Sequence, residues 1–294
     1  MYTEKLKITV FTPTYNRANK LMRVYQSLLS QRIFNFEWLI IDDGSTDETE
    51  NVVAVFLKNK KFSVRYKKKG NGGKHTAYNT ALLLAKGEYF MCLDSDDYLA
   101  PDAMENVAIC LTACRPDEGI IAYKAMKDGE RLSQNFPLNI SYASTSELSL
   151  VYQCKGEFSL IYPTFIARKY PFPVFENEKF VTECVVYDKI AEVCRMRLLS
   201  KVLTICEYQI DGYTSNLNQM MKDNPSGYCQ YFMQRIDMQP KIKDQLIYAG
   251  KFYCFRLFSG NKKIVYIGRH RYMKMLAIPL GGLFWIYYKI YREF

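Results

Sequence analysis

Three acidic side chains follow one short apolar segment and could together bind a divalent cation. Residues 89–93, Tyr-Phe-Met-Cys-Leu, predict a buried strand, and Asp94, Asp96 and Asp97 come directly after it. Carboxylates this close together repel one another unless a cation or a bound ligand compensates them. Hard carboxylate oxygens select Mg²⁺ or Mn²⁺, and Mg²⁺ usually takes one or two carboxylates while substrate phosphates supply further ligands. The segment therefore predicts a cation site, with a solvated acidic turn as the alternative.

The residues before these acids alternate between strand and helix patterns. Residues 5–11, 36–41 and 62–66 have strand patterns, and helical spacing of apolar residues follows each of them. This order is typical of βαβ units in a parallel, doubly wound sheet. Ligands of such sheets bind outside the carboxyl ends of the strands. We therefore expect the loop at 12–17 and the acids at 42–43 and 94–97 to converge on one edge.

Four sequence motifs occur in order across the first hundred residues. They are Thr-Pro-Thr-Tyr-Asn-Arg at 12–17, Leu-Ile-Ile-Asp-Asp-Gly-Ser-Thr-Asp at 39–47, Asn79 before Ala-Lys-Gly-Glu-Tyr at 85–89, and Asp-Ser-Asp-Asp at 94–97. In order and spacing they resemble the GT-A glycosyltransferases of family 2. The resemblance is dense over residues 6–100 and thinner to about residue 215. It implies a nucleotide-sugar donor, usually UDP-linked, a divalent metal (Mn²⁺ or Mg²⁺), and transfer with inversion of the anomeric centre.

The resemblance gives the first strand ends a role in donor binding. Asp43 is the expected acceptor for the uracil N–H, and the loop with Thr12, Pro13, Tyr15 and Arg17 is expected to bracket the base and ribose. The alternative is that the two acids at 42–43 merely begin an Asx turn.

The acidic motif is expected to hold the diphosphate and the metal. Asp94 and Ser95 would approach the ribose and diphosphate, and Asp96, together with Asp94, would bind the metal that neutralises charge on the departing UDP. Two roles stay open for Asp97. It is either a group behind the metal ligands or the cap of a helix near Pro101.

The glycine-containing segment at residues 67–75 does not have the pattern of an NTPase phosphate loop. A Walker loop would need Gly at position 68 and Ser or Thr at position 75, where this chain has Lys68 and His75. Many family members carry Arg immediately before the equivalent of Asn79, where this chain has Tyr78. Lys74 is therefore our candidate for a diphosphate contact, and a solvated lysine is the alternative.

An inverting transfer also needs a carboxylate that takes the proton of the acceptor hydroxyl. Family 2 enzymes often show Glu-Asp in this region with the Asp as base, whereas this chain has Glu183 followed by Cys184. Glu183 is the candidate base, with Asp188 and Glu178 as fallbacks. A structural glutamate at a helix start is the alternative for Glu183. Residues 211–216 resemble a loop that closes over the site in related enzymes.

The composition is that of an ordinary globular enzyme. At 294 residues and 49% apolar content, the chain can bury one large core or two fused ones. We expect an α/β GT-A domain at 1–215, with a Rossmann-like nucleotide-sugar half at 1–115 and an acceptor half at 116–215, and a C-terminal helical extension at 216–294. The nine cysteines include no Cys-x-x-Cys and predict reduced core residues of a cytosolic protein. The polar residues 1–7 show no secretory signal.

The C-terminal segment at 262–294 holds most of the positive charge. Seven basic residues and one acid lie there, in a chain of net charge +10. The uncharged run at 275–288 is shorter than the roughly 20 residues that span a bilayer, so it should lie on a membrane surface. Basic flanks with aromatic residues suit an anionic membrane, while docking on the protein's own core is the alternative and a nucleic-acid surface is not expected. One helical stripe is predicted from Leu280, Leu283, Phe284, Tyr287, Ile290, Tyr291 and Phe294.

These features lead to one expected function and one competing class. We expect inverting, metal-dependent transfer from a UDP-sugar to a glycan or lipid-linked acceptor in bacterial surface-polysaccharide synthesis. The enzyme would be cytoplasmic and peripheral on the inner face of the cell membrane, held through its C-terminal helix. The competing class is a catalytically silent, membrane-attached nucleotide-sugar-binding or scaffold protein of the same fold, which the missing Glu-Asp pair favours and Asp43, Asp94 and Asp96 oppose. A nucleotidyltransferase would show a Gly-rich loop after the first strand, and Thr-Pro-Thr at 12–14 is not one.

Overall fold

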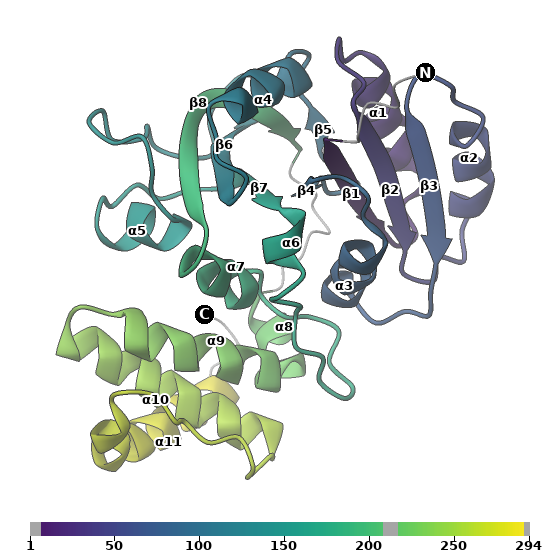
Figure 1. Cartoon of the computed structure of the whole chain (residues 1–294). Helices are drawn as coiled ribbons and strands as arrows, with labels where there is room; N and C mark the ends of the chain where they lie inside the picture. The colour runs from purple at the N-terminus through teal and green to yellow at the C-terminus, as the bar shows by residue number, and fades with distance from the viewer. Residues whose placement is uncertain (1–6, 208–216, 291–294) are drawn as a thin grey trace. The chain divides into compact units, whose positions relative to one another are not determined.

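A computed structural model describes residues 7–207 and 217–290 of the chain (Figure 1). The chain forms two compact units, one from Met1–Pro171 and Val186–Gln209 and the other from Phe172–Val185 and Ile210–Phe294. The expected domain boundary at residue 215 and the expected closing loop at 211–216 lie outside the described residues.

The first unit is built around an eight-stranded mixed sheet in the order β3-β2-β1-β4-β7-β6-β8-β5. The strands are β1 (Ile8–Thr14), β2 (Phe36–Asp42), β3 (Ser63–Lys68), β4 (Tyr89–Cys92), β5 (Tyr98–Leu99), β6 (Glu118–Met126), β7 (Phe158–Pro163) and β8 (Arg195–Cys206). The helices are α1 (Ala18–Leu29), α2 (Thr49–Phe56), α3 (Lys74–Leu84), α4 (Ala103–Thr112), α5 (Thr145–Leu150), α6 (Thr164–Ala167) and α7 (Cys184–Ala191), the last of which begins in the second unit.

The first four strands form the predicted parallel βαβ arrangement. β1 pairs in parallel with β2 and β4, and β2 pairs in parallel with β3. Every residue of β1 and of β2 is buried, as expected for central parallel strands covered on both faces. The four carboxyl ends therefore lie on one edge, which confirms the α/β fold class and positions the site.

The rest of the sheet, beyond the strands for which a parallel arrangement was predicted, is mixed. β7 is inserted between β4 and β6 and runs antiparallel to both, whereas β6 and β8 are parallel. The short β5, which follows the acidic motif, pairs antiparallel with β8. After the acidic turn the chain therefore enters β5, at the edge of the sheet beyond β8. This pairing connects the acidic turn to the β6–β8 half of the sheet.

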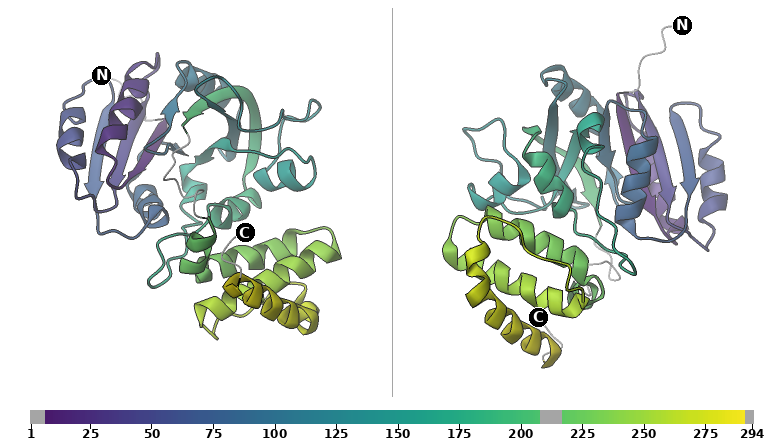
Figure 2. Two further views of the ribbon diagram at one scale, coloured as in Figure 1. Left: turned by 180° about the vertical axis from the view of Figure 1, so that it is seen from behind. Right: turned by 60° about the horizontal axis from the view of Figure 1, so that its bottom comes forward.

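Helices cover both faces of the parallel part of the sheet (Figures 1 and 2). Buried residues of α1, α2 and α4 share one core cluster with alternate strand residues such as Val10, Trp38 and Met91. On the other face, the ring of Tyr78 on α3 lies 5.9 Å from that of Phe11 and 5.2 Å from that of Phe90. Tyr78 is therefore a core residue of α3.

The second unit is helical. It contains α8 (Leu217–Asp223), α9 (Pro225–Met238), α10 (Ile242–Ser259), the short 3₁₀ helix η2 (Arg271–Met273) and α11 (Lys274–Ile290). α10 packs against both α9 and α11, and the three helices lie side by side in Figure 2. Their shared core is aromatic, with Phe232, Phe252 and Phe255 almost completely buried. The expected C-terminal helical extension is thus present.

Candidate active site

Backbone hydrogen bonds hold the four parallel strand ends in register where the predicted residues lie. Asp43 N donates to Thr14 O at 2.8 Å, and Leu93 N donates to Phe11 O at 2.8 Å. On the other side, Lys69 N donates to the carbonyl of Asp42 at 2.9 Å. The loops after β1, β2, β3 and β4 therefore start from one fixed edge.

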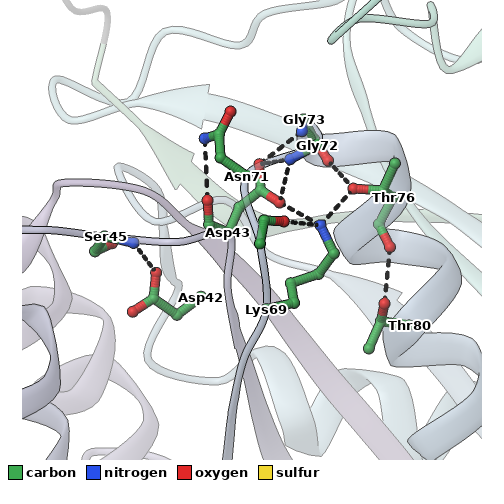
Figure 3. A network of polar contacts seen from close by, with 10 residues as sticks. Asp42, Asp43, Ser45, Lys69, Asn71, Gly72, Gly73, Thr76 and Thr80 are labelled. Carbon is green, nitrogen blue, oxygen red and sulfur yellow. Dashed lines mark hydrogen bonds and ion pairs between the residues drawn. The ribbon is translucent and has the colours of Figure 1, made fainter. Parts of the chain in front are cut away.

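Asp42 and Asp43 are adjacent in sequence but make different contacts (Figure 3). Asp42 is fully buried; its Oδ1 accepts from Ser45 N at 2.7 Å, and its Oδ2 accepts from the hydroxyl of Tyr66 at 2.6 Å. Burial, together with the hydrogen bond to Asp42, raises the pKa of Tyr66. Asp42 therefore makes the Asx-type turn that the sequence left open for both acids.

Asp43 fastens the loop between β3 and α3 to the end of β2 (Figure 3). Its Oδ1 accepts from Lys69 Nζ at 2.5 Å and from Gly72 N at 3.0 Å, and its Oδ2 accepts from Gly73 N at 2.6 Å. Gly73 precedes α3 with φ 89°, a backbone conformation that favours glycine. A carboxylate at this position also complements the positive end of the helix. Gly72 N also lies 3.2 Å from Oδ2, so each carboxylate oxygen of Asp43 accepts two contacts from this loop.

The loop after β1 is held to the loop after β2 by side chains of both. Asn16 has φ 51°, its N–H donates to Ser45 Oγ at 2.9 Å, and its Oδ1 accepts from Thr46 N at 2.8 Å. Tyr15 is 47% exposed beside this link and is free to contact a ligand from solvent. Thr12 is fully buried and accepts from the indole N–H of Trp38 at 2.9 Å. Within the predicted loop, Thr12 thus supports the strand from the core side, and Pro13 is buried in the same strand.

The acidic turn lies between β4 and β5, and each of its three acids forms an ion pair with a different element. Asp94 pairs with Lys74 at the start of α3, with Lys74 Nζ 2.6 Å from Asp94 Oδ1. Asp96 pairs with Arg17 from the loop after β1. The predicted donor-site residues Arg17, Lys74, Asp94 and Asp96 are therefore brought together, with the buried Ser95 between the two acids.

Asp97 faces the other side of the turn. Its Oδ2 lies 3.2 Å from Lys124 Nζ on β6, and its N–H closes the turn onto Asp94 O at 3.1 Å. The helix after the acids, α4, begins at Ala103 with Asp102 at its N-cap position. The helix-cap role for Asp97 is therefore wrong. Asp97 instead lies behind the candidate metal ligands, where it pairs with Lys124.

The pKa values of the acids follow from burial and from these cations. Burial opposes ionisation of Asp94, but the charges of Lys74 and Lys124 outweigh it and hold the pKa of Asp94 below its ordinary value. Burial raises the pKa of Asp97 to about 6, against the opposing effect of Lys124. Of these two acids, the half-buried Asp94 is therefore the more readily ionised, and the buried Asp97 is the less readily ionised.

Two basic residues of this cluster were not identified from the sequence. Lys124 stands alone within the otherwise apolar run at 119–126, and an isolated charge in a strand of that kind was the available signal. Arg23, on α1, donates to the backbone carbonyl of Asp96 at 2.6 Å and pairs with Glu207. In the sequence, Arg23 falls between the apolar positions of α1, as solvent-exposed helix residues do. Nothing in the sequence therefore marked Arg23 as a residue of the site.

The donor set of this turn fits a hard divalent cation. Asp94 and Asp96 supply carboxylate oxygens on one turn, and the local pairs with Lys74 and Arg17 show that the turn gathers positive charge. Among the described residues there is no group of three or more His, Cys, Asp or Glu side chains arranged around one point. A cation here would therefore take one or two protein carboxylates and complete its shell with phosphate oxygens and water, which is the usual environment of Mg²⁺.

The candidate base and its fallbacks lie in the segment around α7. Glu183 directly precedes α7 and is half-buried. Glu178 caps α9: its two carboxylate oxygens accept from Ser226 N at 2.7 Å and Gly227 N at 2.8 Å, so its role is structural. Asp188 is 5% exposed on α7. Glu183 remains the predicted base, and Glu178 is no longer a good fallback.

Comparisons with known proteins identify the family of the domain that carries this site. The model of the family described as "Glycosyl transferase family 2" matches residues 9–137. The chain is 30% identical over 203 residues to an Escherichia coli chondroitin synthase, an alignment that covers 66% of this chain and 28% of that protein. Residues 9–137 therefore form a glycosyltransferase domain that matches family 2, which confirms the resemblance seen in the motifs.

Solved structures show the same fold over nearly the whole chain. S. aureus TarS 1–349 in complex with UDP-GlcNAc superimposes with a TM-score of 0.60 at 18% identity, covering 96% of this chain and 91% of that one. The mannosyltransferase PcManGT from Pyrobaculum calidifontis, in complex with GDP-Man and Mn²⁺, gives a TM-score of 0.56 at 18% identity, with 96% and 74% covered. The matched stretches span only about a tenth to a third of the curated relatives.

Proposed function

We propose that this protein transfers a sugar from a UDP-sugar to a glycan or lipid-linked acceptor, with inversion and with help from Mn²⁺ or Mg²⁺. One observation carries the proposal: in a family 2 domain, Asp94 pairs with Lys74 and Asp96 pairs with Arg17 at the same carboxyl edge of the parallel strands that carries Asp43. Carboxylates that can bind a metal ion are thereby next to basic side chains that can bind a diphosphate.

Each group at this edge has a separate task in the proposed reaction. Asp43 would accept the uracil N–H in place of its longest contact, the one from Gly72 N to Oδ2, and the exposed ring of Tyr15 suits contact with the base. Lys74 and Arg17 are positioned to donate to phosphate oxygens, as charge-assisted hydrogen bonds that strengthen as negative charge collects on UDP. Asp94 and Asp96 would hold the divalent cation, which supplies further neutralisation of the leaving diphosphate.

The acceptor side needs a base. Glu183 would accept the proton of the acceptor hydroxyl as the new glycosidic bond forms and the bond to UDP breaks, which leaves the product with inverted configuration. Support for a UDP-sugar comes from the fold shared with TarS, whose structure holds UDP-GlcNAc. Support for the cation comes from the hard donor set and from PcManGT, whose structure holds Mn²⁺.

For its place in the cell, we propose that the enzyme is cytoplasmic and attaches to the inner face of the membrane, in bacterial polysaccharide synthesis. The free cysteines and the basic C-terminal segment support this location. No helix within the described ranges is long and apolar enough to cross a bilayer.

Release of UDP tests the proposal directly. The purified chain is given a panel of UDP-sugars, with UDP-GlcNAc first, in the presence of Mn²⁺, of Mg²⁺ or of EDTA. We expect UDP release with at least one donor, and its loss with EDTA. Donor binding without release from any donor, with or without a glycan acceptor, would instead support the catalytically silent nucleotide-sugar-binding protein.

A further inference from the structure

The last helix, α11, is apolar on two opposite faces. One face packs on α10: Ala277 is fully buried, Tyr288 is 5% exposed, and Gly281 lies so close to α10 that an added Cβ would come within 2.9 Å of Gly250 O. The reciprocal position, Gly250, lies against Leu280 and Phe284. The docked face is thus a tight helix crossing between two glycines, and it forms part of the core of the helical unit.

The single stripe expected from the sequence is therefore wrong, because the helix divides its members. Leu280 and Phe284 lie on the docked face, while Leu283 and Ile290 are 64% and 66% exposed on the other. The exposed face is continuous over more than three helical turns, at spacings of three and four residues. Its members are Met275, Leu276, Pro279, Leu283, Ile286, Tyr287 and Ile290.

The segment that leads into α11 continues this surface. Val265, Ile267 and Tyr272 are 57%, 79% and 68% exposed, and they alternate with basic residues. Exposed cations lie before Met275 and again at Lys289, and no acidic residue occurs between residues 260 and 290. The cations are Lys262, Lys263, Arg269, Arg271, Lys274 and Lys289.

This combination matches the surface of an anionic bilayer. A contiguous apolar face on a folded protein marks an interaction site, and a rim of one sign selects a partner of the opposite sign. An amphipathic helix that lies in the membrane plane buries its apolar side chains in the headgroup boundary while its cations contact anionic lipids. The Lys289 ammonium lies 4.1 Å from the centre of the ring of Trp285, which packs against the core of the helical unit, so this cation is held at the end of α11.

We propose that residues 262–290 form a membrane-docking surface, in which the exposed face of α11 and the exposed side chains of Val265 and Ile267 enter the headgroup region of an anionic bilayer. Resting on the membrane location proposed above, this inference assigns the contact to one face of α11 and adds the preceding segment to it. The other face of α11 stays docked on α10, so the helix joins the membrane without leaving the fold.

Vesicle co-sedimentation of the full chain tests the surface. Vesicles of phosphatidylcholine alone are compared with vesicles that also contain phosphatidylglycerol, and we expect binding to the second kind. The double variant Leu283→Gln/Ile286→Gln should lose roughly tenfold or more of that binding, since two exposed apolar side chains no longer enter the lipid. The matched control is Leu138→Gln, at a 98% exposed position of the first unit, which should bind like the unsubstituted chain.

A second variant separates the charge contribution. Lys262→Gln/Lys263→Gln should weaken binding to phosphatidylglycerol vesicles at low salt and have a smaller effect at high salt, where surface charges are screened. Lys201→Gln, an exposed lysine on β8, serves as its control. UDP release is measured on all variants, so that loss of the membrane surface is distinguished from loss of the enzyme.

Either of two results would overturn the inference. One is vesicle binding unchanged in both double variants. The other is absence of vesicle binding together with a dimer, seen by light scattering, that the Leu283→Gln/Ile286→Gln variant dissociates, which would make a second copy of the chain the occupant of this face. Because the substituted side chains are exposed, thermal unfolding of the variants should match that of the unsubstituted chain.

Discussion

The ammonium of Lys124 lies 3.2 Å from Asp97 Oδ2, which ties the carboxyl-terminal part of β6 to the turn that carries Asp94 and Asp96. The two side chains are 17% and 10% exposed, so the pair is largely removed from water. Asp97 also closes the turn through its backbone N–H. The ion pair therefore supports, from the side of β6, the turn that carries the two candidate metal ligands.

Replacing Lys124 should loosen this turn. In Lys124→Met, Asp97 is left as a largely buried charge without its partner, and such changes cost about 3–5 kcal/mol when burial is complete and less here. We expect a lower free energy of unfolding and a higher Mn²⁺ concentration for half-maximal UDP release. Lys124→Arg should recover part of both, because it restores the charge. Unaltered unfolding in Lys124→Met, with Lys201→Met as the control, would show that the pair does not hold the turn.

Asp96 should be required for the metal and not for folding. The residue lies on a loop at a strand end, so Asp96→Ala should keep the thermal unfolding profile while it abolishes donor turnover and Mn²⁺-dependent UDP binding. Calorimetric titration of UDP with and without Mn²⁺ measures the difference, and Asp117→Ala, an exposed acid of the same unit, is the control. If Asp96→Ala still binds UDP more tightly with Mn²⁺, the main ligand is Asp94.

Asp43 should contribute to both stability and donor binding. In Asp43→Asn, an amide N–H₂ replaces one of the oxygens that accept from Gly72, Gly73 and Lys69, and a buried donor is left unsatisfied at a cost of about 1–3 kcal/mol. We expect a lower melting temperature and weaker UDP binding. Weaker folding with unchanged UDP affinity, measured well below the melting temperature, would restrict Asp43 to fastening the loop.

The sequence was sufficient for the parts of the site that depend on local pattern. Apolar runs that end in polar residues predicted β1, β2 and β4, and parallel strands necessarily bring their carboxyl ends to one edge. That edge collects Arg17, Lys74, Asp94 and Asp96 as the motifs indicated. Their tasks toward donor and metal stay predictions.

Contacts between distant segments were not predictable in the same way. The antiparallel insertion of β7 and the pairing of Lys124 with Asp97 depend on which strands become neighbours, and period-two patterns do not specify this. The capping of α9 by Glu178 joins residues 48 positions apart, so no local signal marked it. In α11, apolar residues surround the whole helix, and only the packing on α10 decides which of them stay exposed.

The last prediction concerns the base. Two hydrogen bonds fix the backbone next to Glu183. Val185 N donates to Thr182 O at 3.0 Å, and the side chain of Gln234 donates through Nε2 to Val185 O at 3.0 Å. Val185 itself is fully buried, so the start of α7 is anchored in the core and the position of Glu183 is well defined.

Because a base acts only in the chemical step, Glu183→Gln should lower kcat roughly 10²- to 10⁴-fold and leave UDP-sugar affinity nearly unchanged. Glu183→Asp should recover little, since one methylene displaces the carboxylate from the acceptor hydroxyl. Single-turnover transfer rates and donor titrations measure the two quantities, and Glu192→Gln, an exposed glutamate just after α7, is the control. A Gln variant that keeps most of its transfer rate, or loses donor binding in parallel with rate, would remove Glu183 from this role and make Asp188→Asn the next variant to measure.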